Sequence, residues 1–292
     1  MIVLLYSMTL TVRNNFFKGW IIIAALSLLS VAAAGYYAFS VLPDFAASAA
    51  LRPQGLFQSF FQSFAQSNAH NIAQASAYVP FWTMLGAAAY SLVSIIIIYF
   101  FFEKTQAPEI LFLSCFAISL SFEFARIILP LSEILSFPPI YSIVAFRSLL
   151  FGRYFGLFSL FAASVYAAGL DAQKQQSVFS LLVLAALLIA ANVPVDSLIW
   201  DSTFVFGMGY NSMLSTVEMG IVLVTIFTFF VSAYIRDSRS YISIGLGIIM
   251  AFLGRNLLVY SDNWITPLPG LILLALGTWL ASSRLHKIYL WL

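Results

Sequence analysis

Apolar residues run along this chain in long stretches that do not alternate with polar ones. The first, IIIAALSLLSVAAAGYYAFSVL, follows Arg13 and Lys18. Seven more follow at even spacing, over residues 79–102, 109–130, 140–169, 177–195, 214–235, 240–260 and 267–283. Each is close to the roughly 20 residues that an α-helix needs to cross a hydrocarbon core about 30 Å thick. The pattern therefore predicts an all-α, polytopic transmembrane helical bundle of about eight spans.

The composition supports a membrane environment. Of the 292 residues, 62% are hydrophobic and only 8% are charged, whereas a soluble domain carries about 25% charged residues. An outer-membrane barrel would show alternating segments of about ten residues instead. The formal net charge of +2 is too small to indicate a nucleic-acid partner. We therefore expect the protein to lie in a lipid bilayer and to bind no nucleic acid.

Short joints connect the apolar stretches, so we expect residues 1–292 to form a single multi-pass membrane domain. Its expected parts are a first span or signal anchor (1–42), a small extracytoplasmic amphipathic segment (43–78) and a seven-helix bundle (79–292). For the first part, a signal peptide cleaved near Ala32–Ala34 is the alternative. We expect this part to be retained, because the apolar run continues beyond those alanines.

The extracytoplasmic segment repeats the motif FQSF within LFQSFFQSFAQ. At helical spacing the repeat puts four aromatic residues on one face, namely Phe57, Phe60, Phe61 and Phe64. This pattern predicts an amphipathic helix. A helix that binds a lipid surface usually carries Lys and Arg on its polar face, and this one does not. We therefore favour a cap packed on the protein, with a membrane-surface helix as the alternative.

Charges in the joints predict the orientation. With the N-terminus in the cytoplasm and eight spans, the basic residues that fall inside are Arg13, Lys18, Lys104, Lys174, Arg236, Arg239, Arg284 and Lys287. Arg52 is the basic joint residue that falls outside. Cytoplasmic loops of membrane proteins carry such an excess of Lys and Arg. The expected topology is N-in/C-in, and the expected location is the cell (inner) membrane.

Charged residues also occur inside the predicted spans, mostly in their outer halves. They are Glu123, Arg126, Arg147, Arg153, Glu218 and Arg255. A charge at the centre of a spanning helix costs roughly 2.5–3.5 kcal/mol on insertion scales, and such residues are candidates for functional sites. They pair internally, Glu123 with Arg147 and Glu218 with Arg255, or they form an outward-facing site for an anion, since guanidinium groups bind carboxylate and phosphate. Both interpretations remain open; the excess of arginine makes all six residues candidate ligand-binding residues.

Gly152 and Gly156 flank Arg153 in a G-x-x-x-G motif. In spanning helices this spacing lets two backbones approach closely. We expect tight packing of the fourth span here rather than a gating hinge.

The sequence offers little for catalysis. His70 and His286 fall on opposite sides of the predicted membrane, and no H-E-x-x-H, G-x-S-x-G or phosphate-binding loop is present. No serine has an identifiable base beside it. We therefore predict no catalytic residue, no metal site and no cofactor, and an enzyme is the less favoured class.

The layout is one N-terminal span, a small extracytoplasmic piece and seven spans that end inside. Over most of the chain it resembles the bacterial seven-transmembrane-helix sensor receptors, in layout only. The resemblance implies that an outer ligand-binding part signals to the cytoplasm. Because no kinase, cyclase or phosphatase module follows before Leu292, the signal would pass to a separate cytoplasmic or membrane protein.

Two functions follow from these expectations. The first is a protein that senses or binds an anionic small molecule or lipid in the outer half of its bundle. The alternative is a transporter or flippase component for an anionic solute or lipid, and a structural role in a membrane complex is a further possibility. Transport needs polar residues that reach both faces, and the chain below Arg153 is nearly uncharged there, which favours binding.

The predicted orientation can be tested with reporter fusions. Fusions after Lys104, Lys174, Arg239 and Leu292 should report a cytoplasmic location, and fusions near His70 and Asp201 an extracytoplasmic one. Inverted readings at any two of these positions would contradict the N-in/C-in topology.

Overall fold

The computed structural model describes residues 10–40, 76, 78–102, 107–209, 211–261 and 263–290. Its α-helices are α1 (Leu10–Ser40), α4 (Tyr78–Phe102), α5 (Pro108–Ser119), α6 (Ile128–Ile134), α7 (Pro139–Ala167), α8 (Gln175–Asn192), α9 (Asn211–Ile235), α10 (Ser240–Val259) and α11 (Pro267–Leu290). Two 3₁₀ helices, η1 (Leu120–Ile127) and η2 (Ala172–Lys174), and two strands, β1 (Val195–Trp200) and β2 (Phe206–Met208), complete them.

Eight helical stretches among the described residues are long and apolar enough to cross a membrane. They coincide with the eight predicted spans, and this confirms the all-α polytopic bundle. The third stretch, Pro108–Glu133, joins α5, η1 and α6 into one span. The amphipathic helix predicted around Phe60 lies outside the described residues, so it stays a prediction.

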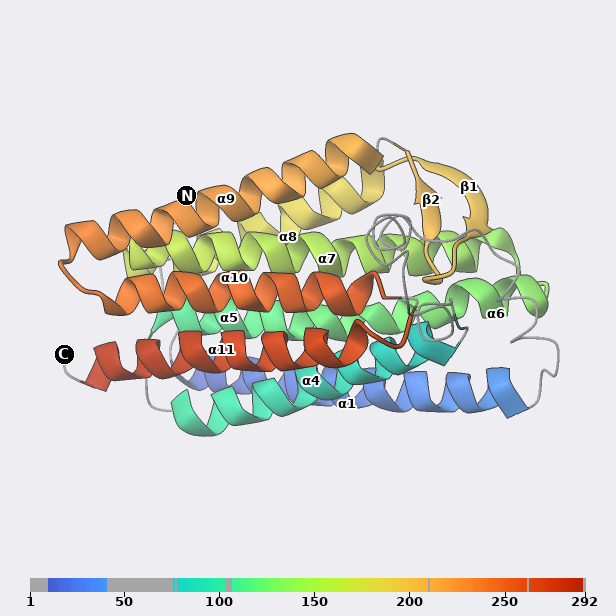
Figure 1. Ribbon diagram of the computed structural model, residues 1–292, viewed down its shortest axis with the longest axis horizontal. Coiled ribbons are helices and arrows are strands. Elements are labelled where there is room, and N and C mark those ends of the chain that lie inside the picture. Colours follow the sequence, from blue (N-terminus) through green and yellow to red (C-terminus); the bar gives the residue numbers. More distant parts are fainter. Residues whose placement is uncertain are drawn as a thin grey trace, which may run out of the picture.

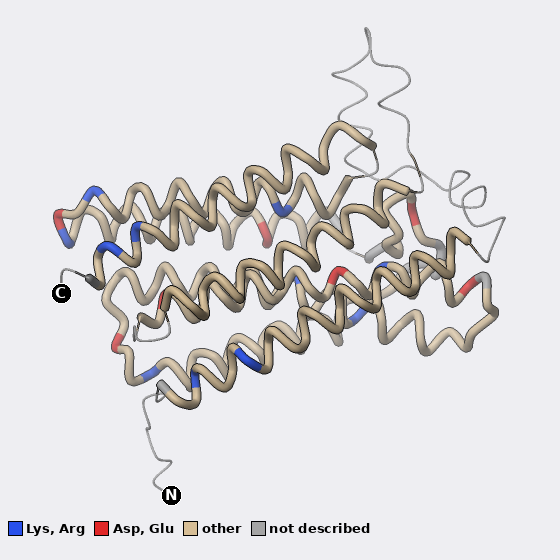
Figure 2. The backbone as a smooth tube through the Cα atoms, turned by 90° about the horizontal axis from the view of Figure 1, so that it is seen from below, with Lys and Arg blue, Asp and Glu red and all other residues tan. Residues whose placement is uncertain are grey.

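The helices lie side by side (Figure 1), and the start of α1 and the end of α11 share one end of the bundle. The β-hairpin lies at the opposite end, called the hairpin end below. Lys and Arg gather toward the end away from the hairpin (Figure 2). This distribution is the one that the N-in/C-in prediction requires, with the hairpin end outside.

The third span forms the centre of the bundle. In the most apolar 18 residues of each span, 89% of the residues are buried in the third span and 72% in the span of α7. The corresponding share is 17% in the spans of α8 and α9. The centre packs against α7, while α10 packs against α11 and α1 against α4. The peripheral helices expose large apolar side chains, as lipid-facing helices do.

The central span changes from α to 3₁₀ geometry halfway along. Ser119 and Ser121 each donate a hydrogen bond of 2.7 Å to the carbonyl three residues earlier. Such bonds compete with the regular ladder and bend helices. With about three residues per turn, η1 places residues i and i+3 directly above one another. Glu123 and Arg126 therefore lie on the same side of η1.

Close approach of α7 to this span depends on its two glycines. A methyl group at Gly152 would overlap Phe122, and one at Gly156 would overlap Ser119. The G-x-x-x-G motif therefore serves tight packing, as predicted. Gly254 and Gly277 play the same part between α10 and α11, where a methyl group would overlap the facing backbone.

The joint between α8 and α9 forms an antiparallel hairpin of β1 and β2. The Asp201 carboxylate closes its turn by accepting hydrogen bonds from the amides of Thr203 (2.9 Å) and Val205 (3.1 Å). Trp200 is buried and donates from its indole to Glu133 at the end of the central span. This contact attaches the hairpin to the end of the central span.

Replacing Gly156 by Ala should lower the stability of the detergent-solubilised protein by about 1–3 kcal/mol, as overpacking of a tight contact does. The matched control is Gly220→Ala on α9, where a methyl group would meet nothing within 4 Å. The control should keep or raise stability, because Ala favours a helix by up to about 1 kcal/mol over Gly. Thermal melts that place both variants at the same midpoint would contradict the packing role.

Candidate functional site

A buried ion pair joins the central span to α7. Arg153 donates from Nε to Glu123 Oε1 at 3.0 Å and from Nη2 to Oε2 at 3.2 Å. Both side chains are 3% exposed. This two-point contact is the geometry in which guanidinium and carboxylate groups bind most strongly. It fixes the position of Arg153 relative to η1.

A second guanidinium group, that of Arg126, shares the same carboxylate more loosely. Its Nη1 lies 3.5 Å from Glu123 Oε2. Its Nε donates to the carbonyl of Thr203 at 2.9 Å, and its Nη2 donates to the same carbonyl. Because Arg126 is only 1% exposed, this carbonyl replaces the water that the cation lost. The hairpin thus completes the surroundings of the charge cluster.

The third buried guanidinium group, that of Arg255 on α10, has weaker partners. It is 2% exposed and donates to the Arg153 carbonyl and to the Asn256 side chain, each at 3.4 Å. Among the described residues no carboxylate oxygen lies within 4 Å of it. In this cluster three buried guanidinium groups therefore surround one fully buried carboxylate, that of Glu123, while the partly buried carboxylates of Asp201 and Glu218 act on Arg126 and Arg153 from farther away.

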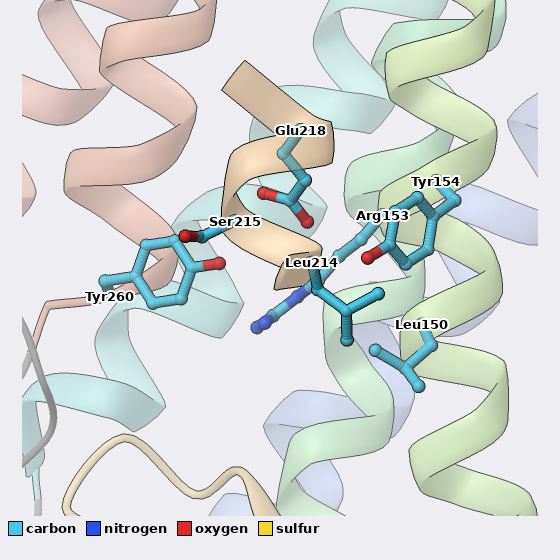
Figure 3. A pocket seen from close by; sticks show the side chains of 7 residues that line it. All are labelled: Leu150, Arg153, Tyr154, Leu214, Ser215, Glu218 and Tyr260. Atoms are coloured by element: carbon cyan, nitrogen blue, oxygen red, sulfur yellow. The ribbon is translucent and has the colours of Figure 1, made fainter. Parts of the chain in front are cut away.

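A small cavity adjoins this cluster at the face of α7 that meets α9 and α10 (Figure 3). It is lined by Leu150, Arg153, Tyr154, Leu214, Ser215, Glu218 and Tyr260. About 20 Å³ is open to the centre of a water molecule, enough for roughly one such molecule. The cavity is therefore polar on several sides but small.

Arg153 presents an unused donor at this cavity. Its Nη1 is buried and has no hydrogen-bond partner among the described residues. The guanidinium carbon lies 5.4 Å from the centre of the Tyr260 ring, a distance at which cation and ring attract. Glu218 lines the same cavity (Figure 3), yet it forms no ion pair with Arg153 or Arg255 within the described parts of the chain. The cavity thus brings a buried cation and a carboxylate together without pairing them.

The internal pairs considered from the sequence are therefore not the ones observed. Glu123 binds Arg153 and Arg126 rather than Arg147, and Glu218 does not pair with Arg255. Arg147 is exposed and lies on the outside of the bundle. The reason is helical geometry: at 3.6 residues per turn, the offset of six positions from Arg147 to Arg153 turns them about 120° apart.

The structure thus gathers four of the six candidate residues, Glu123, Arg126, Arg153 and Arg255, and brings Glu218 to the adjoining cavity. Sequence reasoning missed the Thr203 carbonyl and Tyr260. A backbone acceptor leaves no trace in residue type, although the Asp201–Thr203 turn that presents it is a recognisable Asx-type motif. Whether the cluster binds an anion stays a prediction.

Toward the other end of the bundle the same three helices enclose a mostly apolar void. The next void between them is lined by Leu157, Leu160, Val222, Thr225, Ile248 and Phe252 and has no room for a water molecule. Within the described residues, no group of three or more His, Cys, Asp or Glu side chains is placed to hold a metal ion. Between α7, α9 and α10, the described polar lining thus lies toward the hairpin end of this void.

Together, fold and site define the class: a multi-pass helical membrane protein with a buried, arginine-rich cluster inside its bundle. No protein-family model, curated protein or solved structure matches this chain.

A double-mutant cycle tests which arginine pairs with Glu123. Glu123→Gln alone should cost about 3–5 kcal/mol, because it leaves buried cations without their counter-charge. Glu123→Gln and Arg153→Met should show a coupling of about 1–3 kcal/mol, and Glu123→Gln with Arg147→Met close to none, since only neighbours couple. The free energies of unfolding of the parent, the three single variants and the two double variants give both couplings. A larger coupling to Arg147 would contradict the observed pairing.

Proposed function

We propose that this protein binds an anionic group, a carboxylate or phosphate, in the outer half of its helical bundle, and that it acts as a sensor rather than as a carrier. The group would belong to a small molecule or to a lipid headgroup. The observation that carries this proposal is the cluster of three buried guanidinium groups around one fully buried carboxylate, that of Glu123; the partly buried carboxylates of Glu218 and Asp201 lie near the cluster without pairing with it. An uncompensated buried cation destabilises a fold by several kcal/mol, so an anion that neutralises it gains binding energy.

The donors suit an anion. Guanidinium groups stay charged and match the planar oxygens of carboxylate and phosphate. Arg153 still has a free Nη1 at the cavity, and Tyr154 and Ser215 add hydroxyl groups to its lining. These groups would hold an anion at a point where α7, α9 and α10 meet.

Glu218 defines how the site would respond to a ligand. Its half-buried carboxylate stands at the wall of a cavity that now has room only for water. An entering anion would repel it and push it outward together with α9, whose span is largely lipid-exposed. Displacement of this peripheral helix is a means of passing the bound state to a separate cytoplasmic or membrane protein.

The alternative, a transporter or flippase component, receives less support. A transported anion would have to cross the zone of Leu160, Val222 and Phe252, which is apolar and without room for water. A charge in such surroundings is costly. We therefore favour a binding and sensing protein, and we propose the cell (inner) membrane as its location, with the cluster toward the outside.

Thermal melts of the detergent-solubilised protein test the binding proposal. Inorganic phosphate, acetate and a short-chain phosphatidylglycerol would each be added against chloride at equal ionic strength. A bound anion raises stability by RT ln(1 + [L]/Kd), about 2.7 kcal/mol at one hundred times Kd. A shift with phosphate or acetate indicates a soluble ligand, and a shift with the lipid alone indicates a headgroup.

The variants Arg153→Met and Arg255→Met should lose this shift, whereas the control Arg239→Gln, an exposed cation at the other end, should keep it. Glu218→Gln should bind the probe several-fold more tightly, because it removes a like charge from the cavity. The proposal is wrong if no anion shifts the parent, or if both arginine variants respond as the parent does.

A further inference from the structure

A second feature lies on the outer surface of the bundle, where α7 and α8 leave a groove of about 290 Å³. Apart from Arg147 and Ser148 its lining is apolar, including Phe122, Phe151 and Leu187. The rings of Phe122 and Phe151 pack edge to face, with their centres 5.4 Å apart, and form the floor of the groove. The groove is thus a long apolar trough with one cation.

Arg147 is unusual for a residue within a spanning helix. It is exposed, and no described residue accepts a hydrogen bond from it or pairs with its charge. A lipid-facing cation is expensive unless its charged end reaches the headgroups or finds a partner there. The protein itself provides no such partner among the described residues.

The depth of Arg147 fits a partner in the headgroup layer. At 1.5 Å per residue, the 29 residues of α7 span about 43 Å. Arg147 lies eight residues from Pro139, so its Cα is about 12 Å from the hairpin end of the helix. A centred hydrocarbon core of about 30 Å would place that Cα roughly 5 Å below its surface. An extended arginine side chain bridges this distance to a lipid phosphate.

We propose that the groove between α7 and α8 binds one anionic phospholipid of the outer leaflet. Its phosphate accepts hydrogen bonds from the Arg147 guanidinium group, with Ser148 beside it. One acyl chain lies along the trough over Phe122, Phe151 and Leu187. Charge complementarity selects an anionic lipid, because the groove contains a cation and no carboxylate.

This site is separate from the interior cluster. It lies on a different face of α7 from Arg153, and its lining shares no residue with the interior cavity. Either site can therefore be absent without affecting the inference for the other. Phe122 is nevertheless adjacent to Glu123 along η1, so the floor of the groove and the charge cluster belong to one turn.

Native mass spectrometry of the purified protein tests the proposal. The protein would be released from mixed micelles with equal phosphatidylglycerol and phosphatidylcholine, and retained lipid counted. The parent should retain one phosphatidylglycerol in preference to phosphatidylcholine. Arg147→Gln should reduce this retention about tenfold, the loss expected for a hydrogen bond to a charged group. Arg239→Gln, an exposed cation at the other end, is its control.

Ala191→Trp, at an exposed groove position, should block the trough and lower retention without disturbing the core, whereas Leu188→Trp, exposed on α8 but outside the groove, should not. Arg153→Met should leave the retained lipid unchanged, which separates this site from the interior one. The proposal is overturned if the parent retains both lipids equally, or if Arg147→Gln and Ala191→Trp retain as much as the parent. It is equally overturned if these two variants change the oligomeric state instead, since the groove would then seat a second copy.

Discussion

The hairpin half of this protein depends on the carboxylate of Glu123. It receives two hydrogen bonds from Arg153 and stands 3.5 Å from Arg126, all in a region closed to water. A buried ion pair gains little over apolar packing, but removing one partner is strongly unfavourable. The chain therefore has to keep η1, α7 and the hairpin in register around this group. The 3₁₀ turn, the glycines of α7 and the Thr203 carbonyl all serve that arrangement.

One fully buried carboxylate serves three buried guanidinium groups, and the partly buried carboxylates of Asp201 and Glu218 act on Arg126 and Arg153 from a greater distance without pairing with them. Uncharged oxygens of the protein compensate a buried guanidinium group only weakly. The hydrogen bonds of Arg255 to a backbone carbonyl and to Asn256, each 3.4 Å long, show this. Arg153 keeps an unused donor and lines the cavity that α7 shares with α9.

Helix α7 carries two arginines with different surroundings. Arg153 turns into the bundle and is held by Glu123, while Arg147 turns toward the lipid beside an apolar groove. The 120° between them follows from six residues of α-helix. One helix thus provides both a buried cation at the interior cluster and an exposed one beside the groove, and η1 touches both environments.

The sequence by itself determined the architecture, because span length and apolarity are local properties that a bilayer reads directly. It also indicated close packing at Gly152 and Gly156 and the concentration of charge in one half of the bundle. Which charges meet was decided only by the tertiary structure, since pairing depends on helix rotation and on which helices are neighbours. The pairing of Glu123 with Arg153 rather than Arg147, and the carbonyl of Thr203 on Arg126, arise from contacts across 30 and 77 residues of chain. No local pattern of residue types encodes contacts at such separations.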